Sequence, residues 1–251
     1  MNCLVLNKFK KILLKNFRII LKDKKEICEN TLAFYFDTTN SGFTFEAGQY
    51  AHFTINDPKF HDEKGDTRPF SIANSPHIKN EIIISARINS SVFINNLSHL
   101  SPGAEIHVSN PEGNFRFDND LSLTSVFITG GIGITPVRSL IENEIYKSGN
   151  RKIFLFYSNK TESQTAFFDD FKNWSESFTN FKFIPLIEDL NNENWKYEFG
   201  NVTEIIMLKH LDNFFNKVYY MTGPQTMVKS VKNILLKNKV SPDNIQTEQF
   251  N

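Results

Sequence analysis

The chain has 251 residues, which is enough for one large domain or two ordinary ones. Its hydrophobic content of 40% and charged content of 22% are those of a globular protein. Lys plus Arg and Asp plus Glu both number 28, so no excess of positive charge indicates nucleic-acid binding.

Only two cysteines are present, Cys3 and Cys28, and they form no CxxC pair. Two thiolates cannot hold a four-cysteine iron–sulfur cluster, and the six histidines lack the spacing of metal ligands, so we predict no metal site. The sparse cysteines favour a reducing compartment, and we expect a cytoplasmic protein. No apolar run reaches the roughly 18–20 residues of a membrane span, so no transmembrane segment is expected.

The N-terminal 25 residues contain eight basic residues and one acid. The apolar residues between them are too interrupted for a signal peptide. The stretch is either a weak patch for a membrane surface or an acidic partner, or a solvated first strand with an extension. We treat residues 1–14 as a possible extension.

Strands and turns alternate in the first half of the chain. Six strands are predicted, over residues 17–23, 31–37, 49–55, 70–73, 81–88 and 105–109. Apolar residues at helical spacing predict one short helix over residues 90–100, which Pro102-Gly103 ends. This pattern indicates a small antiparallel β-barrel.

After about residue 121, buried strands alternate with helices. Strands are predicted over residues 125–129, 152–157, 181–187, 217–221 and 245–250, and helices from Pro136 to a cap at Gly149 and over 163–174, 203–211 and 225–239. This order predicts a doubly wound α/β domain with a parallel sheet, in which ligands bind at the carboxyl ends of the strands. We therefore place one domain at residues 1–120 and a second at 121–251.

Residues 68–76 (RPFSIANSP) combine a cation, an aromatic ring and a hydroxyl. In a strand, Arg68, Phe70 and Ile72 share one face and Ser71 takes the other. A guanidinium can bind a phosphate with two hydrogen bonds, a ring offers a flat wall, and a hydroxyl can bond a heteroatom. The stretch suits a planar aromatic ligand with a phosphate tail. The alternative is an ordinary strand after a Pro-containing turn.

Two glycine turns follow buried strands in the second half. Residues 130–136 (GGIGITP) lead into a helix whose free N–H groups and dipole favour a phosphate, and Thr135 adds a hydroxyl. The motif departs from GxGxxG because Pro136 occupies the last glycine position. Residues 222–224 (TGP) occupy the equivalent place after a later strand. Either turn alone is also compatible with a purely structural role.

The joint order of these motifs resembles the ferredoxin–NADP⁺ reductase superfamily of FAD-binding oxidoreductases. The resemblance covers roughly residues 17–250 and includes residues 48–50 (GQY), 102–103 (PG), 111–115 (PEGNF) and 248–250 (EQF). It implies a β-barrel FAD domain followed by an NAD(P)-binding α/β domain. It also implies a flavoprotein that takes a hydride from NAD(P)H and passes electrons to an acceptor.

The resemblance further implies roles for the flavin-side residues. Arg68 would bind the flavin phosphates, and Phe70 would flank the ring where the family usually has Tyr. Ser71 would bond the ring where the hydride arrives. The remaining implied contacts come from the same stretch: Pro69, with the backbone of Ile72, Ala73 and Asn74.

On the nucleotide side, the resemblance implies catalytic roles for Thr222, where many relatives have Cys, and for Glu248, with the aromatic Phe250 near the flavin. Ser158 and Lys160 follow the second parallel strand and favour NADPH slightly, but a solvated loop lysine explains them equally well, and the choice stays open. The implied nucleotide contacts are Gly131, Gly133, Thr135, Pro136, Gly223 and Pro224.

The electron acceptor is not indicated by any motif. Many relatives carry a fused ferredoxin or haem domain, and because this sequence ends at Asn251 we expect a separate redox partner: a ferredoxin, a flavodoxin or an oxygenase component. One alternative is a reductase of free flavin or small molecules. Another is a non-catalytic flavin- or nucleotide-binding subunit of a larger complex. The oligomeric state and the choice of FAD over FMN also stay open.

Overall fold

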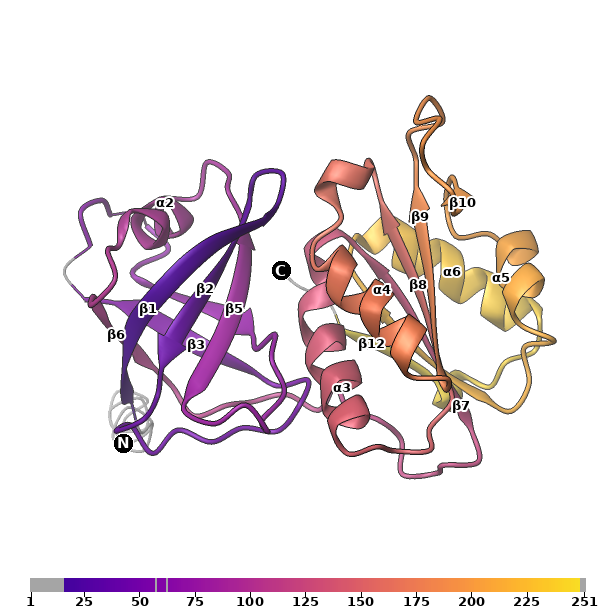
Figure 1. The fold of residues 1–251 in the computed structure, drawn as a ribbon, viewed down its shortest axis with the longest axis horizontal. Coiled ribbons are helices and arrows are strands. Elements are labelled where there is room, and N and C mark those ends of the chain that lie inside the picture. The colour runs from indigo at the N-terminus through magenta and orange to yellow at the C-terminus, as the bar shows by residue number, and fades with distance from the viewer. Residues whose placement is uncertain (1–15, 57, 62, 249–251) are drawn as a thin grey trace, which may run out of the picture.

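The computed structural model describes residues 16–248 apart from 57 and 62, and it contains two sheets that lie side by side (Figure 1). Helix α3 (Ile134–Tyr146) lies between them, and the second sheet carries helices on both faces (Figure 1). The predicted fold, an antiparallel barrel followed by a parallel-sheet domain, is confirmed. The predicted boundary near residue 120 falls between the two sheets and stays a prediction.

The first sheet is antiparallel throughout and curls into a barrel. Its elements are β1 (Phe17–Cys28), β2 (Thr31–Asp37), β3 (Tyr50–Ile55), β4 (Thr67–Ser71), β5 (Glu81–Arg87), α2 (Val92–His99) and β6 (Glu105–Val108). The strand order is β4-β3-β6-β1-β2-β5. Its edges meet where the N–H of Ala73, just past β4, donates to the carbonyl oxygen of Ile83 in β5 (2.7 Å). Phe34, Phe36 and Phe53 fill the barrel core, because alternate residues of its strands point inward.

The second sheet is parallel throughout, in the order β10-β9-β8-β7-β11-β12. Its strands are β7 (Thr124–Gly130), β8 (Ile153–Asn159), β9 (Phe181–Ile187), β10 (Glu198–Phe199), β11 (Lys217–Thr222) and β12 (Ile245–Glu248). The other helices are α4 (Phe168–Ser177), α5 (Glu204–His210) and α6 (Gln225–Lys237). Helices α3 and α4 cover one face, and α5 and α6 cover the other (Figure 1). The strand order reverses between β7 and β11, which is where such sheets bind ligands.

The predicted helix over residues 163–174 is wrong at its start. A short 3₁₀ turn spans Glu162–Gln164, and α4 begins only at Phe168. Between them Phe167 takes a left-handed conformation (φ 59°), which places its ring 4.9 Å from the Arg138 guanidinium carbon. Periodicity could not show this, because the apolar pattern continues through the turn.

Helix α3 fastens the two domains together through the residues that follow β4. Arg138 donates to the carbonyl oxygen of Ala73 (3.0 Å), and the Ser139 hydroxyl donates to that of Asn74 (2.7 Å). The Glu142 carboxylate accepts from the N–H of Ser75 (2.5 Å). The segment after the RPFS motif is therefore held by the helix that follows the first glycine turn. This brings the two candidate binding motifs to one junction.

Candidate functional site

The two glycine turns touch backbone to backbone. A short 3₁₀ turn (Gly131–Gly133) links β7 to α3, and Gly223 follows β11 with φ 118°. A Cβ atom on Gly133 would lie 2.8 Å from both N and Cα of Gly223, and one on Gly223 would lie 2.7 Å from the carbonyl oxygen of Gly130. Glycine is needed at both positions because no side-chain atom fits between the turns.

Thr222 stabilises the contact between the two turns. Its side chain is fully buried, and its hydroxyl donates to the carbonyl oxygen of Gly133 (2.7 Å) and accepts from the Thr129 hydroxyl (2.7 Å). Both hydrogen-bonding functions of Thr222 are thus occupied. The structure gives both residues a supporting role in the turns, and the expected contacts of Thr222 with the nicotinamide and of Gly133 with the nucleotide stay predictions.

A cavity of about 310 Å³ opens at the domain junction, between the RPFS motif and the first glycine turn. Pro69, Phe70 and Ser71 line it from the barrel, and Ile132 and Thr135 line it from the second domain. The Ser71 hydroxyl is buried without a hydrogen-bond partner among the described residues. An unpaired buried hydroxyl costs about 1–3 kcal/mol, so this cavity fits a ligand with a heteroatom at that point.

The ring of Phe70 forms part of this wall. It packs against Phe53 (centroids 5.8 Å apart) and against Phe93 of α2 (5.7 Å), which leaves it half-buried. The guanidinium carbon of Arg68 lies 5.6 Å from the Phe93 ring centroid, beside the start of α2, and one nitrogen bonds backbone carbonyls such as that of Gly65 (2.7 Å). Arg68 therefore sits near a helix N-terminus, where a phosphate is favoured.

The residues after Ser71 turn away from the cavity. The N–H of Ile72 donates to the carbonyl oxygen of Gln49 (3.0 Å), and the N–H of Ala73 is used in closing the barrel. The Asn74 amide bonds the backbone of β5, with its side-chain oxygen 2.7 Å from the N–H of Ile83. The barrel already uses the backbone N–H groups of Ile72 and Ala73, and the expected contact of this stretch with a flavin ring stays a prediction.

Thr135 connects the domains instead of facing a nucleotide alone. Its hydroxyl donates to the carbonyl oxygen of Ile132 (2.9 Å), which leaves it to accept from the Ser85 hydroxyl in β5 (2.7 Å). Pro136 is buried in the first turn of α3 and is the third helical residue, not the first as predicted. Both residues fix the position of α3 against the cavity that Ser71 lines.

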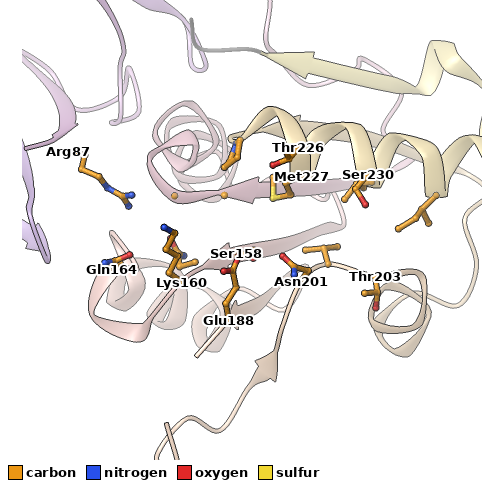
Figure 2. Close-up of a pocket in the computed structure, with 17 residues that line it drawn as sticks. Arg87, Ser158, Lys160, Gln164, Glu188, Asn201, Thr203, Thr226, Met227 and Ser230 are labelled. Carbon is orange, nitrogen blue, oxygen red and sulfur yellow. The ribbon is translucent and has the colours of Figure 1, made fainter. Parts of the chain in front are cut away.

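A second cleft, of about 390 Å³, runs along the carboxyl ends of the parallel strands (Figure 2). Of the predicted nucleotide residues, it is lined by Gly131, Ser158, Lys160 and Pro224. Gly131 has φ 55°, and a Cβ there would meet only a guanidinium nitrogen of Arg87, at 3.7 Å. The backbone at Gly131 is therefore open to a ligand, and its contact with a nucleotide stays a prediction.

Arg87 and Asn159 also line this cleft and are not among the residues predicted from the sequence. Arg87, at the end of β5, lines both this cleft and the cavity that Ser71 lines, so the two spaces meet at its side chain. Asn159 is 5% exposed, and neither atom of its amide has a hydrogen-bond partner in the described part of the chain. No local pattern marks Arg87, because only the packing of the barrel on the second domain brings it to the nucleotide side.

Glu248 ends β12 beside Thr222, and its carboxylate has a buried oxygen without a partner in residues 16–248. Burial raises the pKa of this carboxyl to about 7. Phe250 lies outside the described residues. The predicted acid at the end of the last strand therefore stands in an environment that disfavours its charge, but it lines neither of the two cavities, and its catalytic role stays a prediction.

The buried Glu248 carboxyl should make stability depend on pH. Its folded pKa of about 7 lies above the ordinary value of 4.5, so the folded state binds the proton more tightly. The free energy of unfolding, relative to Glu248→Gln, should therefore be highest below pH 4.5, fall as pH rises toward 7, and level off above it. Urea unfolding across this range checks the result, with exposed Glu46→Gln as the control. A flat difference would contradict the burial.

Comparison with known proteins agrees with this geometry. Residues 127–233 match the family model of the oxidoreductase NAD-binding domain. One component of the Na⁺-translocating NADH-quinone reductase of Neisseria meningitidis is 28% identical over 198 residues, which are 73% of this chain and 49% of the relative. The chain thus spans about half the length of the curated relatives it matches.

Solved structures show the same two-domain fold. The Amycolatopsis cytochrome P450 reductase superposes with a TM-score of 0.81 at 20% identity, covering 94% of this chain and 70% of that one. The FAD/NAD-binding domain of Vibrio cholerae nitric oxide dioxygenase also gives 0.81, at 16% identity, covering 93% and 98%. These findings agree with the resemblance seen in the sequence: residues 127–233 match the oxidoreductase NAD-binding domain, and the chain shares the two-domain fold of FAD/NAD-binding reductases.

Proposed function

We propose that the chain works as an NAD(P)H-dependent flavoprotein reductase that holds FAD beside Phe70 and Ser71 and the nucleotide beside Gly131. The observation that carries the proposal is the junction of two cavities at Arg87, with the unpaired Ser71 hydroxyl in one of them. Two flat rings that enter from opposite sides would meet there. Placing the rings in contact supplies much of the rate, so no further acid–base group is required.

The chain's residues have separate tasks in this proposal. Arg68, with the start of α2, binds the flavin phosphates, and Phe70 and Ile94 wall the ring. Ser71 gives its free hydroxyl to a ring heteroatom. Arg87 meets the nucleotide phosphates at the domain junction. The chemistry that FAD supplies when bound is acceptance of a hydride and onward transfer of electrons.

The electron acceptor is a further proposal. We still expect a ferredoxin, a flavodoxin or an oxygenase component as the acceptor. The name of the curated relatives, NADH-quinone reductase, adds a second candidate, which is electron transfer toward a quinone within a larger assembly. Among the described residues, no helix is long and apolar enough to cross a membrane. The cytoplasmic location rests on the sparse cysteines and stays a prediction.

The basic test is spectroscopic. The purified protein should be yellow, or become yellow with added FAD, and NADH or NADPH should bleach it in the absence of oxygen. A protein that cannot be loaded with flavin would refute the proposal. A yellow protein that neither nucleotide bleaches would favour the non-catalytic alternative. Arg68→Ala should weaken flavin binding, and unchanged flavin affinity in that variant would refute its phosphate role.

Ser71→Ala tests the role of the unpaired hydroxyl. Without flavin, the variant should be at least as stable as the parent, because it removes a buried hydroxyl that has no hydrogen-bond partner among the described residues. With flavin, the rate of ring reduction should fall about tenfold, the equivalent of one lost hydrogen bond. Ser85→Ala is the matched control: it lines the same cavity but bonds Thr135, so the flavin-free variant should lose stability. Unfolding curves and stopped-flow reduction measure the two effects.

A further inference from the structure

Charged side chains are ordered along the nucleotide cleft (Figure 2). Its two cations, Arg87 and Lys160, lie toward the barrel, where the flavin-side cavity opens. Asn201 and Ser230 lie farther along and carry no charge. Between these groups lies Glu188, the one carboxylate among the described lining residues. A ligand that spans the cleft therefore meets positive charge first, then a carboxylate, then a neutral end.

The place of Glu188 is fixed by the sheet. It follows the last residue of β9, and its N–H donates to the carbonyl oxygen of Asn159 at the end of β8 (3.0 Å). This holds Glu188 next to Ser158, as Figure 2 shows. The side chain is exposed, and the structure shows no ion pair or hydrogen bond to its carboxylate within residues 16–248. The carboxylate is therefore available to a ligand in the cleft.

The order of charges matches the order of groups in one class of dinucleotide. With the nicotinamide at the flavin, the diphosphate comes next and suits Arg87 and Lys160. The adenosine ribose follows, and a carboxylate accepts hydrogen bonds from its hydroxyls but repels a phosphate on the 2′-oxygen. The adenine then reaches an apolar end that contains Val202 and Ile234. Lys160 in this arrangement serves the diphosphate, not a 2′-phosphate.

We propose that Glu188 makes the cleft selective for NADH over NADPH. The inference rests on the proposed function, because it assumes that the nicotinamide end meets the flavin. It replaces the slight preference for NADPH that Ser158 and Lys160 suggested from sequence. The negative charge comes from Glu188, which follows β9. Ser158, near the end of β8, carries no charge.

Binding of nucleotide fragments tests the inference without turnover. Calorimetry on the flavin-loaded chain should show 5′-AMP binding at least about tenfold more tightly than adenosine 2′,5′-bisphosphate, because the second differs by a 2′-phosphate near a carboxylate. Glu188→Gln should bring the ratio of the two dissociation constants closer to one. Glu188→Lys should make the bisphosphate the tighter ligand. Asp189→Asn is the matched control, since it removes one charge from the neighbouring residue outside the cleft lining, and its ratio should not change.

The outcomes separate this inference from the proposed function. Tighter or equal binding of the bisphosphate by the parent chain would overturn the inference, as would identical ratios in Glu188→Lys and Asp189→Asn. Failure of both probes to bind would overturn it together with the assignment of the cleft. If NADPH bleaches the flavin as readily as NADH, the reductase function is supported and the proposed selectivity for NADH is refuted. If neither nucleotide bleaches it, the proposed function falls.

Discussion

Replacing Arg138 by methionine should lower the free energy of unfolding by about 2–4 kcal/mol, the largest effect that we expect from a single substitution. The guanidinium bonds Asp170 (2.9 Å), Glu142 (3.3 Å) and the carbonyl oxygen of Ala73 (3.0 Å), and its carbon lies 5.2 Å from the Trp174 ring centroid. Methionine keeps most of the packing but leaves these oxygens without their cation. The loss falls short of a fully buried pair because Asp170 is 40% exposed and can turn to water.

Two further variants separate charge from packing. Adding Glu142→Gln and Asp170→Asn to Arg138→Met should restore part of the stability, because the stranded carboxylates are then neutral. Arg18→Met is the surface control: its ion pair with Glu105 has side chains 67% and 37% exposed, so the loss should stay below about 1 kcal/mol. Urea unfolding measures all of them. Equal losses in Arg138→Met and Arg18→Met would mean that the helix does not fasten the domains through this residue.

The sequence predicts the fold well wherever a local pattern decides the structure. The strand predicted over residues 181–187 matches β9 at both ends, because a mostly apolar run, interrupted by Lys182 and bounded by Asn180 and Glu188, suits a buried parallel strand. The start of α5 is also set locally, because the Thr203 hydroxyl accepts a hydrogen bond from the N–H of Ile206 (3.3 Å) and caps the helix. In both cases neighbours in sequence supply the interactions that fix the structure.

The site is predicted less completely, because its contacts join distant parts of the chain. A threonine after a buried strand looks available to a ligand, yet the Thr222 hydroxyl is used by Thr129 and Gly133, 93 and 89 residues away. Arg87 reaches the nucleotide cleft only because the barrel packs on the second domain. Ser71 differs from Thr222: the sequence predicted that its hydroxyl bonds a ligand, and the structure leaves this hydroxyl without a partner in the described chain.

Replacing Gly133 by alanine should cost about 1–3 kcal/mol of stability, although its backbone suits alanine well. Its φ of −58° and ψ of −13° are helical, so the cost comes only from the added methyl group. That methyl would lie 2.8 Å from two backbone atoms of Gly223 and 3.0 Å from the carbonyl carbon of Thr222. Backbone atoms cannot rotate away as a side chain can, so the two turns must separate.

Separation of the two turns should also weaken ligand binding. The Thr222 hydroxyl would lose its 2.7 Å bond to the carbonyl oxygen of Gly133, and the open turn at Gly131 would shift with it, so the affinity for 5′-AMP should fall. Gly149→Ala is the matched control, because a methyl there meets only the flexible side chain of Glu144, and φ is not positive. Unfolding and calorimetry check the pair. If Gly133→Ala matches Gly149→Ala in both measurements, the two turns are not in contact, and glycine at 133 must be explained by the ligand itself.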